Sequence, residues 1–165
     1  MKPLLLLLLA SGLASAGSLP EGFAGLPWGA SLAALPHAQQ IAATQQYQCY
    51  RDGDGTSTIA QANLSQVRLC FSDDQFYFAQ MEFAGQKNQD KLLAYGKAMW
   101  GEPKLGQRFT EAYVWGGPQE GVYIELEFSK TDGRGTLAYV YLPVYSKTQE
   151  AAKAQRAKPR PGSGF

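Results

Sequence analysis

Residues 66–83 read Gln66-Val-Arg-Leu-Cys-Phe-Ser-Asp-Asp-Gln-Phe-Tyr-Phe-Ala-Gln-Met-Glu-Phe83, and this stretch decides the fold class. Apolar and polar residues alternate over 66–71, which is the period of a strand with one buried face. The turn follows at 72–75, where Ser and Asp side chains bond their own backbone. The return strand is expected to place Tyr77, Ala79, Met81 and Phe83 on one face, and Phe76, Phe78, Gln80 and Glu82 on the other. The stretch therefore predicts an antiparallel hairpin.

A helix is predicted over 88–100, because the apolar period changes after Gly85. Asn88 is the expected N-terminal cap. The apolar stripe is expected to consist of Leu92, Tyr95 and Met99, widened by Leu93 and Trp100. Gly101 and Pro103 indicate the end of the helix, since Gly takes the left-handed conformation easily and Pro cannot continue a helix.

Further strands are predicted on both sides of this stretch, at 46–51, 111–115, 122–128 and 136–142. The third alternates most clearly, with Ile124 and Leu126 inward and Glu125 outward. Ser31 is expected to cap a short helix over 32–35. The predicted class is α+β: an antiparallel sheet of about five to six strands, with the main helix 88–100 and the short N-terminal helix packed on one face.

Residues 1–16 have the three parts of a secretory signal peptide: a basic start, six consecutive leucines, and the small residues Ala14-Ser-Ala16. The apolar run falls short of the ~20 residues of a spanning helix. We therefore expect cleavage after Ala16 and a periplasmic or secreted protein. One α+β domain is expected over 17–146, followed by a basic tail over 147–165 that is helical at first and then disordered.

Charge is unevenly distributed along the chain. The tail carries Lys147, Lys153, Arg156, Lys158 and Arg160 against Glu150 alone, so its net charge is +4. The rest of the mature chain carries a compensating excess of acids, which argues against a nucleic-acid binder. A basic tail would be attracted to anionic envelope surfaces, and no segment of the mature chain is expected to span a membrane.

Cys49 and Cys70 are the two cysteines of a chain that is expected to leave the reducing cytosol. Both fall on predicted strands, so we expect a cross-strand disulfide. Two buried thiols or a redox pair are the alternatives, although a redox pair usually has the C-x-x-C spacing, which is absent here.

The segment Gly22-Phe-Ala-Gly-Leu-Pro-Trp-Gly29, followed by Ser31, the hairpin and the Trp100-Gly-Glu-Pro103 helix end, resembles a family of small secreted bacterial α+β domains of uncharacterised function. The resemblance covers 22–143 and implies no activity. Pro36 departs from the longer first helix that the family pattern implies. Trp28 is expected to anchor the N-terminal segment over the sheet, and stacking on a ligand is the alternative.

Few residues point to catalysis or metal binding. His37 is the only histidine, so a multi-histidine metal site is excluded. Asp52 and Asp54 have calcium-loop spacing, but Ser57 and Asn63 stand where such a loop needs Gly and Glu, so a tight turn is expected instead. We expect no metal and no cofactor.

Two sets of residues are candidates for function. A binding surface on the wetter sheet face is expected to consist of Phe76, Phe78, Tyr123, Tyr139 and Tyr141. Glu125 and Glu127 lie two apart on one strand, and we expect Glu82 and Arg68 to join them on the same face. Paired carboxylates would suit a secreted hydrolase. The favoured interpretation is a non-enzymatic binding or assembly module of the cell envelope, with an unknown protein or polymer as partner, and the hydrolase is the alternative.

Overall fold

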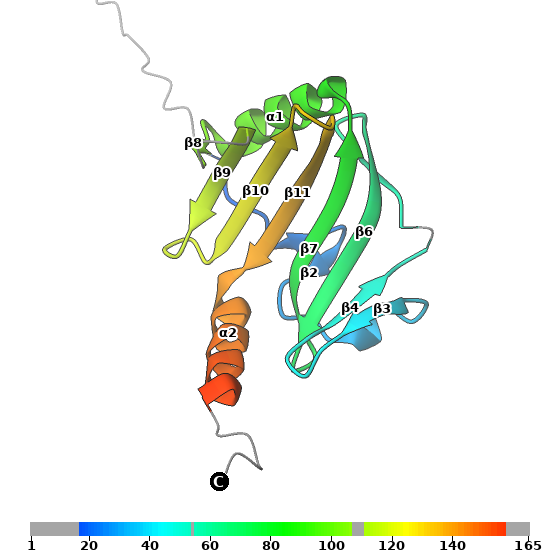
Figure 1. Ribbon diagram of the computed structural model, residues 1–165, viewed down its shortest axis with the longest axis vertical. Helices are drawn as coiled ribbons and strands as arrows, with labels where there is room; N and C mark the ends of the chain where they lie inside the picture. The colour runs from blue at the N-terminus through cyan, green and yellow to red at the C-terminus, as the bar shows by residue number, and fades with distance from the viewer. Residues whose placement is uncertain (1–16, 54, 107–110, 158–165) are drawn as a thin grey trace, which may run out of the picture.

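The computed structural model describes residues 17–53, 55–106 and 111–157 (Figure 1). The predicted signal peptide and the last eight residues lie outside this part of the chain. Its elements are β1 (Gly22–Phe23), β2 (Leu26–Pro27), the 3-10 helix η1 (Leu32–Ala34), β3 (Gln39–Ala43), β4 (Gln48–Arg51), β5 (Ser57–Ile59), β6 (Ala62–Ser72), β7 (Gln75–Ala84), α1 (Gln86–Trp100), β8 (Lys104–Leu105), β9 (Glu111–Gly117), β10 (Val122–Ser129), β11 (Arg134–Tyr141) and α2 (Leu142–Ala157).

Nine strands of the described chain form one antiparallel sheet, which confirms the α+β class. The order is β3-β4-β6-β7-β11-β10-β9-β8, and β5 pairs with β6 beyond this path. The predicted count of five to six was too low. β5 and β8 were missed because they are short, and β3 was missed because every residue in it is exposed, so it carries no alternation of apolar and polar residues.

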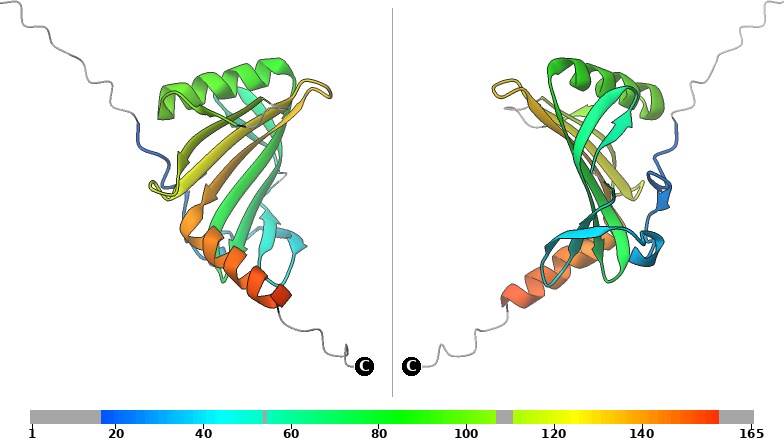
Figure 2. Two further views of the ribbon diagram at one scale, coloured as in Figure 1. Left: turned by 60° about the vertical axis from the view of Figure 1, so that its left-hand side comes forward. Right: turned by 90° about the vertical axis from the view of Figure 1, so that its right-hand side faces the viewer.

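One face of the sheet carries the core. Figure 2 shows α1 and the N-terminal strands on this side, whereas α2 projects from the other. Ile124 and Leu126 of β10 and Met81 of β7 are fully buried there. The predicted inward and outward faces of β10 are confirmed, since its residues alternate between buried and half-buried along the whole strand.

The start of α1 differs from the prediction. The helix begins at Gln86, and its N-cap is Gly85, not Asn88. Gly85 has φ of +84°, a conformation that costs glycine little and other residues more. The Asn88 side chain instead donates a hydrogen bond to the Ala84 carbonyl at 2.9 Å. The predicted stop is confirmed, because Gly101 is the C-cap with φ of +85°.

The buried stripe of α1 consists of Gln89, Leu92 and Gly96. Leu92 is 2% exposed and belongs to the main core, as expected. Met99 is 45% exposed, so its predicted place on the stripe was wrong. The helix phase is set by Gly96, which allows α1 to approach the ring of Trp115 closely.

The N-terminal segment packs on the core face through Trp28. Its indole stacks on Phe76 with ring centroids 4.9 Å apart, and its Nε1 donates to the Pro20 carbonyl at 2.8 Å. The expected anchoring role is therefore confirmed. The short helix that follows is the single 3-10 turn η1, and Ser31 caps it as predicted by accepting a hydrogen bond from the Ala33 amide.

The hairpin of β6 and β7 has the predicted turn, with Asp73 and Asp74 both at positive φ. Its register shifts twice. One shift follows Ser65, and the other lies between the pairs Cys70 with Phe78 and Phe71 with Phe76. An extra residue in a ladder reverses the faces of the residues beyond it. Strict alternation therefore fails at the lower end of the hairpin.

The side of the sheet opposite the core carries a small second hydrophobic cluster, to which α2 contributes Val144. Cys49 and Cys70 pair across β4 and β6 within it, and their sulfur atoms are 2.03 Å apart, so the predicted disulfide is present. The boundary predicted between 146 and 147 falls inside α2. Thr148, beyond that boundary, is only 5% exposed.

Candidate binding face

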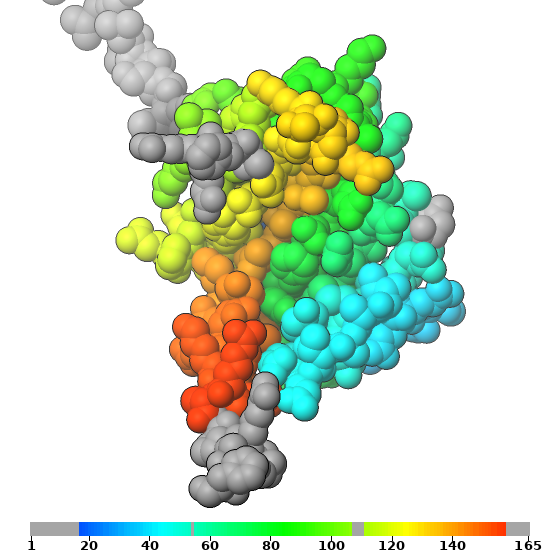
Figure 3. Space-filling view, viewed as in Figure 1, coloured from blue at the N-terminus to red at the C-terminus, as the bar shows by residue number. Residues whose placement is uncertain are grey.

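The face of the sheet opposite the core is uncovered over most of its extent, and we call it the open face. Figures 1 and 3 view the molecule from this side, with the side chains of β7, β10 and β11 at the surface above α2. The strand registers place its residues in three rows, which are Tyr123, Val140 and Phe78, then Glu125, Ala138, Gln80 and Arg68, then Glu127, Thr136 and Glu82. Aromatic and charged side chains therefore share one surface.

Only two of the five aromatic residues predicted for a binding surface lie on this face. Phe78 and Tyr123 do, and both are half-buried. Phe76 is fully buried and Tyr139 is 4% exposed, both in the main core, so their prediction as wetter-face residues was wrong. Tyr141 also lies on the core side, where its ring stacks on Trp28 at 6.1 Å.

The three misplaced residues have two different physical causes. Phe76 was assigned to the face of Phe78 by alternation, but the register shift between them turns Phe76 toward the core beside Phe71. Tyr139 and Tyr141 were misplaced because β11 is apolar on both faces. Leu137 and Tyr139 are buried in the core, while Ala138 and Val140, each 9% exposed, lie on the open face. An apolar run of this kind does not reveal which residues face the core.

Glu125 and Glu127 project together from β10 onto the open face, as predicted. Partial burial raises the pKa of Glu125, and the negative charge of Glu127 raises it further, while a hydrogen bond from the Tyr123 hydroxyl opposes the shift. The same burial and the two carboxylates raise the pKa of Tyr123. Among the described residues, neither glutamate has a salt bridge. The carboxylate pair thus lies beside an aromatic ring and takes part in no salt bridge within the described ranges.

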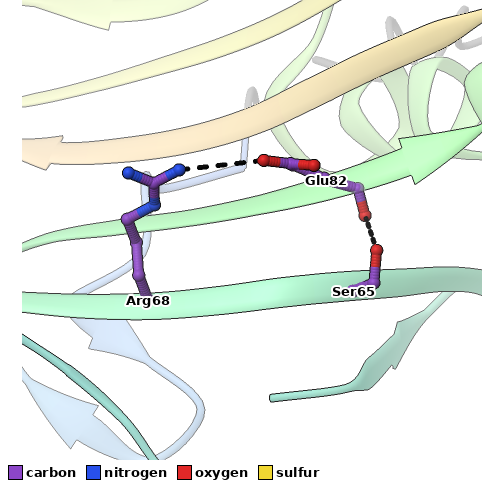
Figure 4. Close-up of polar contacts among 3 residues, drawn as sticks. All are labelled: Ser65, Arg68 and Glu82. Carbon is purple, nitrogen blue, oxygen red and sulfur yellow. Dashed lines mark hydrogen bonds and ion pairs between the residues drawn. The ribbon is translucent and has the colours of Figure 1, made fainter. Parts of the chain in front are cut away.

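The predicted partners Arg68 and Glu82 meet on the same face (Figure 4). Arg68 Nη2 lies 3.8 Å from Glu82 Oε1, and both side chains are about 40% exposed, at 41% and 43%. Ser65 Oγ donates to the backbone carbonyl of Glu82 at 3.4 Å. A surface ion pair of this kind contributes little to stability. It leaves Arg68 paired with Glu82, while Glu125 and Glu127 have no ion-pair partner in the described part of the chain.

The geometry does not favour the hydrolase chemistry that paired carboxylates suggested. Glu127 lines a shallow cavity of about 240 Å³ together with Glu82, Ser129 and Arg134, but Glu125 does not line it. The two carboxylates therefore do not converge on one enclosed substrate site. Within the described ranges, no three His, Cys, Asp or Glu side chains are grouped so that they could hold a metal ion. Asp54, one of the two calcium-loop candidates, lies outside those ranges.

Sequence reasoning missed the apolar middle of this face. Val140 lies between Tyr123 and Phe78, Ala138 lies between Glu125 and Gln80, and each is only 9% exposed. Their position depends on the pairing of β11 between β7 and β10, and no local sequence pattern predicts that pairing. A weakly polar centre with charges around it is typical of a surface that receives another molecule.

Comparison of the chain with protein-family models, with curated proteins and with solved structures found no match. No helix in the described part of the chain is long and apolar enough to cross a bilayer.

Proposed function

We propose that this protein is an exported, non-enzymatic binding module of the cell envelope, whose open face binds a basic segment of a partner protein. The observation that carries the proposal is the pair Glu125 and Glu127, which lies without a salt bridge among the described residues beside the half-buried Tyr123. A Lys or Arg side chain from a partner would supply the missing positive charge and lay its apolar stem along the aromatic ring.

The electrostatics support a cationic partner over an anionic one. Glu125 has a raised pKa because it is partly buried beside Glu127. An incoming cation would stabilise both carboxylates, whereas an anion would add to their repulsion. Complementary charge of this kind raises the association rate and the specificity of a protein interface.

Export is supported by the N-terminal segment of the sequence and is compatible with the disulfide between Cys49 and Cys70. Helix α2 carries the exposed residues Lys147, Lys153 and Arg156 against the single acid Glu150, so it is basic. We propose that they add attraction to anionic envelope polymers or lipid head groups. This attraction acts over a Debye length of about 8 Å and weakens as salt rises.

The test is affinity capture of proteins from an envelope extract, with the double variant Glu125→Lys/Glu127→Lys compared with the wild type. The control is Asp90→Lys/Glu102→Lys, which makes the same charge change at two exposed acids on or beside α1. A specific partner should be captured by the wild type and the control but lost by the open-face variant. Cross-linking should then place a basic segment of that partner against Tyr123. Equal capture by all three proteins would refute the role of the open face.

A further inference from the structure

A second, partly enclosed cleft of about 340 Å³ lies where the loop between β3 and β4 meets the turn between β6 and β7. Figure 1 shows these two connections side by side at the lower end of the sheet. Its lining includes Gln45, Gln48, Tyr47, Phe71 and Asp73. None of its lining residues belongs to the three rows of the open face, and only Tyr47 reaches the second cluster beside α2, so the cleft is a separate feature of the molecule.

The cleft is built on a hydrogen-bonded frame. Thr44 Oγ1 accepts hydrogen bonds from the amides of Gln46 and Tyr47 at 3.2 and 3.1 Å. Ser72 Oγ donates to the Gln46 carbonyl at 2.8 Å, which ties this loop to the β6–β7 hairpin. The walls are therefore held from both sides before any ligand arrives, and a preformed site loses less entropy on binding.

Several polar groups of the cleft have no role in that frame. Gln48 Oε1 accepts a hydrogen bond from the Tyr50 hydroxyl at 2.6 Å, while the side-chain nitrogen of Gln48 donates to no other residue of the described chain. Within the same part of the chain, the side chains of Gln45 and Asp73 make no hydrogen bond or ion pair with another residue. Amide donors and a free carboxylate acceptor thus line the cleft together.

The backbone at Asp73 provides an independent reason to look for a role of its side chain. Asp73 and Asp74 lie at φ of +48° and +58°, a region that glycine occupies at lower cost. At Asp74 this conformational cost is offset by local hydrogen bonds. Its carboxylate accepts one from Ser31 Oγ at 2.7 Å and one from the Leu32 amide at 2.9 Å, and these bonds lower the pKa of Asp74. The Asp73 side chain makes no such contact in the described structure.

The chemistry of the lining selects a class of ligand. Its residues are Leu32, Thr44, Gln45, Gln46, Tyr47, Gln48, Phe71, Asp73 and Asp74. Among the described residues they include amides, carboxylates and the half-buried ring of Tyr47, but no Lys, Arg or His, and the ring of Phe71 is buried in the main core. A ligand with many hydroxyl groups can donate to carboxylates, accept from amides and place its C–H surface on an aromatic ring such as that of Tyr47. An anionic ligand would meet two carboxylates with no cation in the lining. The volume, at the lower end of the usual ~300–1,000 Å³ range, suits a short ligand.

We infer that this cleft is a binding site for a neutral, hydroxyl-rich saccharide, with Asp73, Gln45 and Gln48 as the residues that hydrogen-bond its hydroxyl groups. The site lies beyond the function proposed for the open face and does not depend on it. Glu125→Lys/Glu127→Lys should therefore leave saccharide binding unchanged, so either proposal can fail alone.

The test is NMR titration of the purified protein with two soluble tetrasaccharides, neutral chitotetraose and anionic tetragalacturonate. The informative variant is Asp73→Gly, because glycine suits the positive φ and this substitution removes the side chain without a cost to the turn. Its matched control is Gln61→Gly, at the exposed β5–β6 turn, where Gln61 has φ of +64°.

Chitotetraose is expected to shift the amide signals of residues 44–48 and 71–74 and the side-chain amide signals of Gln45 and Gln48. Asp73→Gly should weaken this binding about tenfold, the effect of losing a hydrogen bond to a charged group, while Gln61→Gly should not change it. The inference is overturned if neither sugar binds, if tetragalacturonate binds as tightly as chitotetraose, or if Asp73→Gly binds like the wild type.

Discussion

Cys49 and Cys70 lie directly opposite each other on β4 and β6, with their Cα atoms 4.0 Å apart. The bond between them is buried with Tyr77 of β7 and Val144 of α2. It therefore connects the β3–β4 edge of the sheet to the central hairpin at the point where the C-terminal helix packs. Covalent linkage and helix packing meet in one small cluster, separate from the main core.

Removal of this bond by Cys49→Ala/Cys70→Ala should lower the free energy of unfolding by about 3 kcal/mol. The two cysteines are 21 residues apart, and closing a loop of that length restricts the unfolded chain by this amount. Urea unfolding of the two proteins measures the difference. A reducing agent should destabilise the wild type to a similar degree and leave the variant unaffected. A variant as stable as the oxidised wild type would contradict the prediction.

Gly96→Ala should destabilise the protein by roughly 1–3 kcal/mol, the range for overpacking, although alanine favours helices more than glycine does. A Cβ at this position would stand 2.5 Å from Cζ2 of Trp115. A thermodynamic cycle with Trp115→Leu provides the control. In that background the same substitution should no longer be destabilising, because the opposing ring is gone. Additive losses would show that the close contact is not the cause.

Gln89→Leu should stabilise the protein by roughly 1–2 kcal/mol. Gln89 is fully buried on α1, and neither its amide nitrogen nor its oxygen has a hydrogen-bond partner in the described structure. Leu92→Ala, on the same buried stripe, should lose roughly 2–5 kcal/mol and confirms that the stripe faces the core. Both are measured in urea. A loss of stability in Gln89→Leu would indicate that the amide is satisfied in solution.

Truncation after Ser146 should lower the free energy of unfolding by roughly 1–3 kcal/mol, and the urea midpoint should fall with it. It removes the buried Thr148, whose hydroxyl donates to the Val144 carbonyl at 2.9 Å, and Gln155, which hydrogen-bonds Gln46. This reverses the expectation from sequence that everything from Lys147 is dispensable for folding. The control is truncation after Ala157, which keeps all of α2. Equal midpoints for the two truncated chains would restore the original expectation.

Glu125→Gln should raise stability at pH 7 but not at pH 4. Because the folded-state pKa of Glu125 is raised by burial and by Glu127, the folded protein binds more protons than the unfolded chain just above the ordinary glutamate pKa. The ionisation of Glu125 therefore has no effect on the free energy of unfolding at low pH. It lowers that free energy as the pH rises from the ordinary glutamate pKa through the raised pKa of the folded state. Urea midpoints of both proteins between pH 4 and 7 test this. A difference that stays constant with pH would point to another cause.

Local features of the chain were predictable because their causes are local. The alternation along β10, the turn at Asp73 and Asp74, and the stop of α1 at Gly101 each depend on a few consecutive residues. The placement of both cysteines on paired strands also followed from the strand pattern. Strand periodicity and turn chemistry determine these features before any tertiary contact forms.

The candidate sites depended on contacts that only the tertiary structure decides. Phe76 and Phe78 differ in face because β7 pairs with a shifted β6, and Tyr139 lies in the core because β11 is inserted between β7 and β10. The cleft at Asp73 exists because Ser72 holds a loop that is 26 residues earlier in the sequence. Sequence alone thus determined an α+β chain with a disulfide and an outward carboxylate pair. The folded structure decided which face stays open and where a cleft forms, since both depend on strand order and register between segments that are distant in the chain.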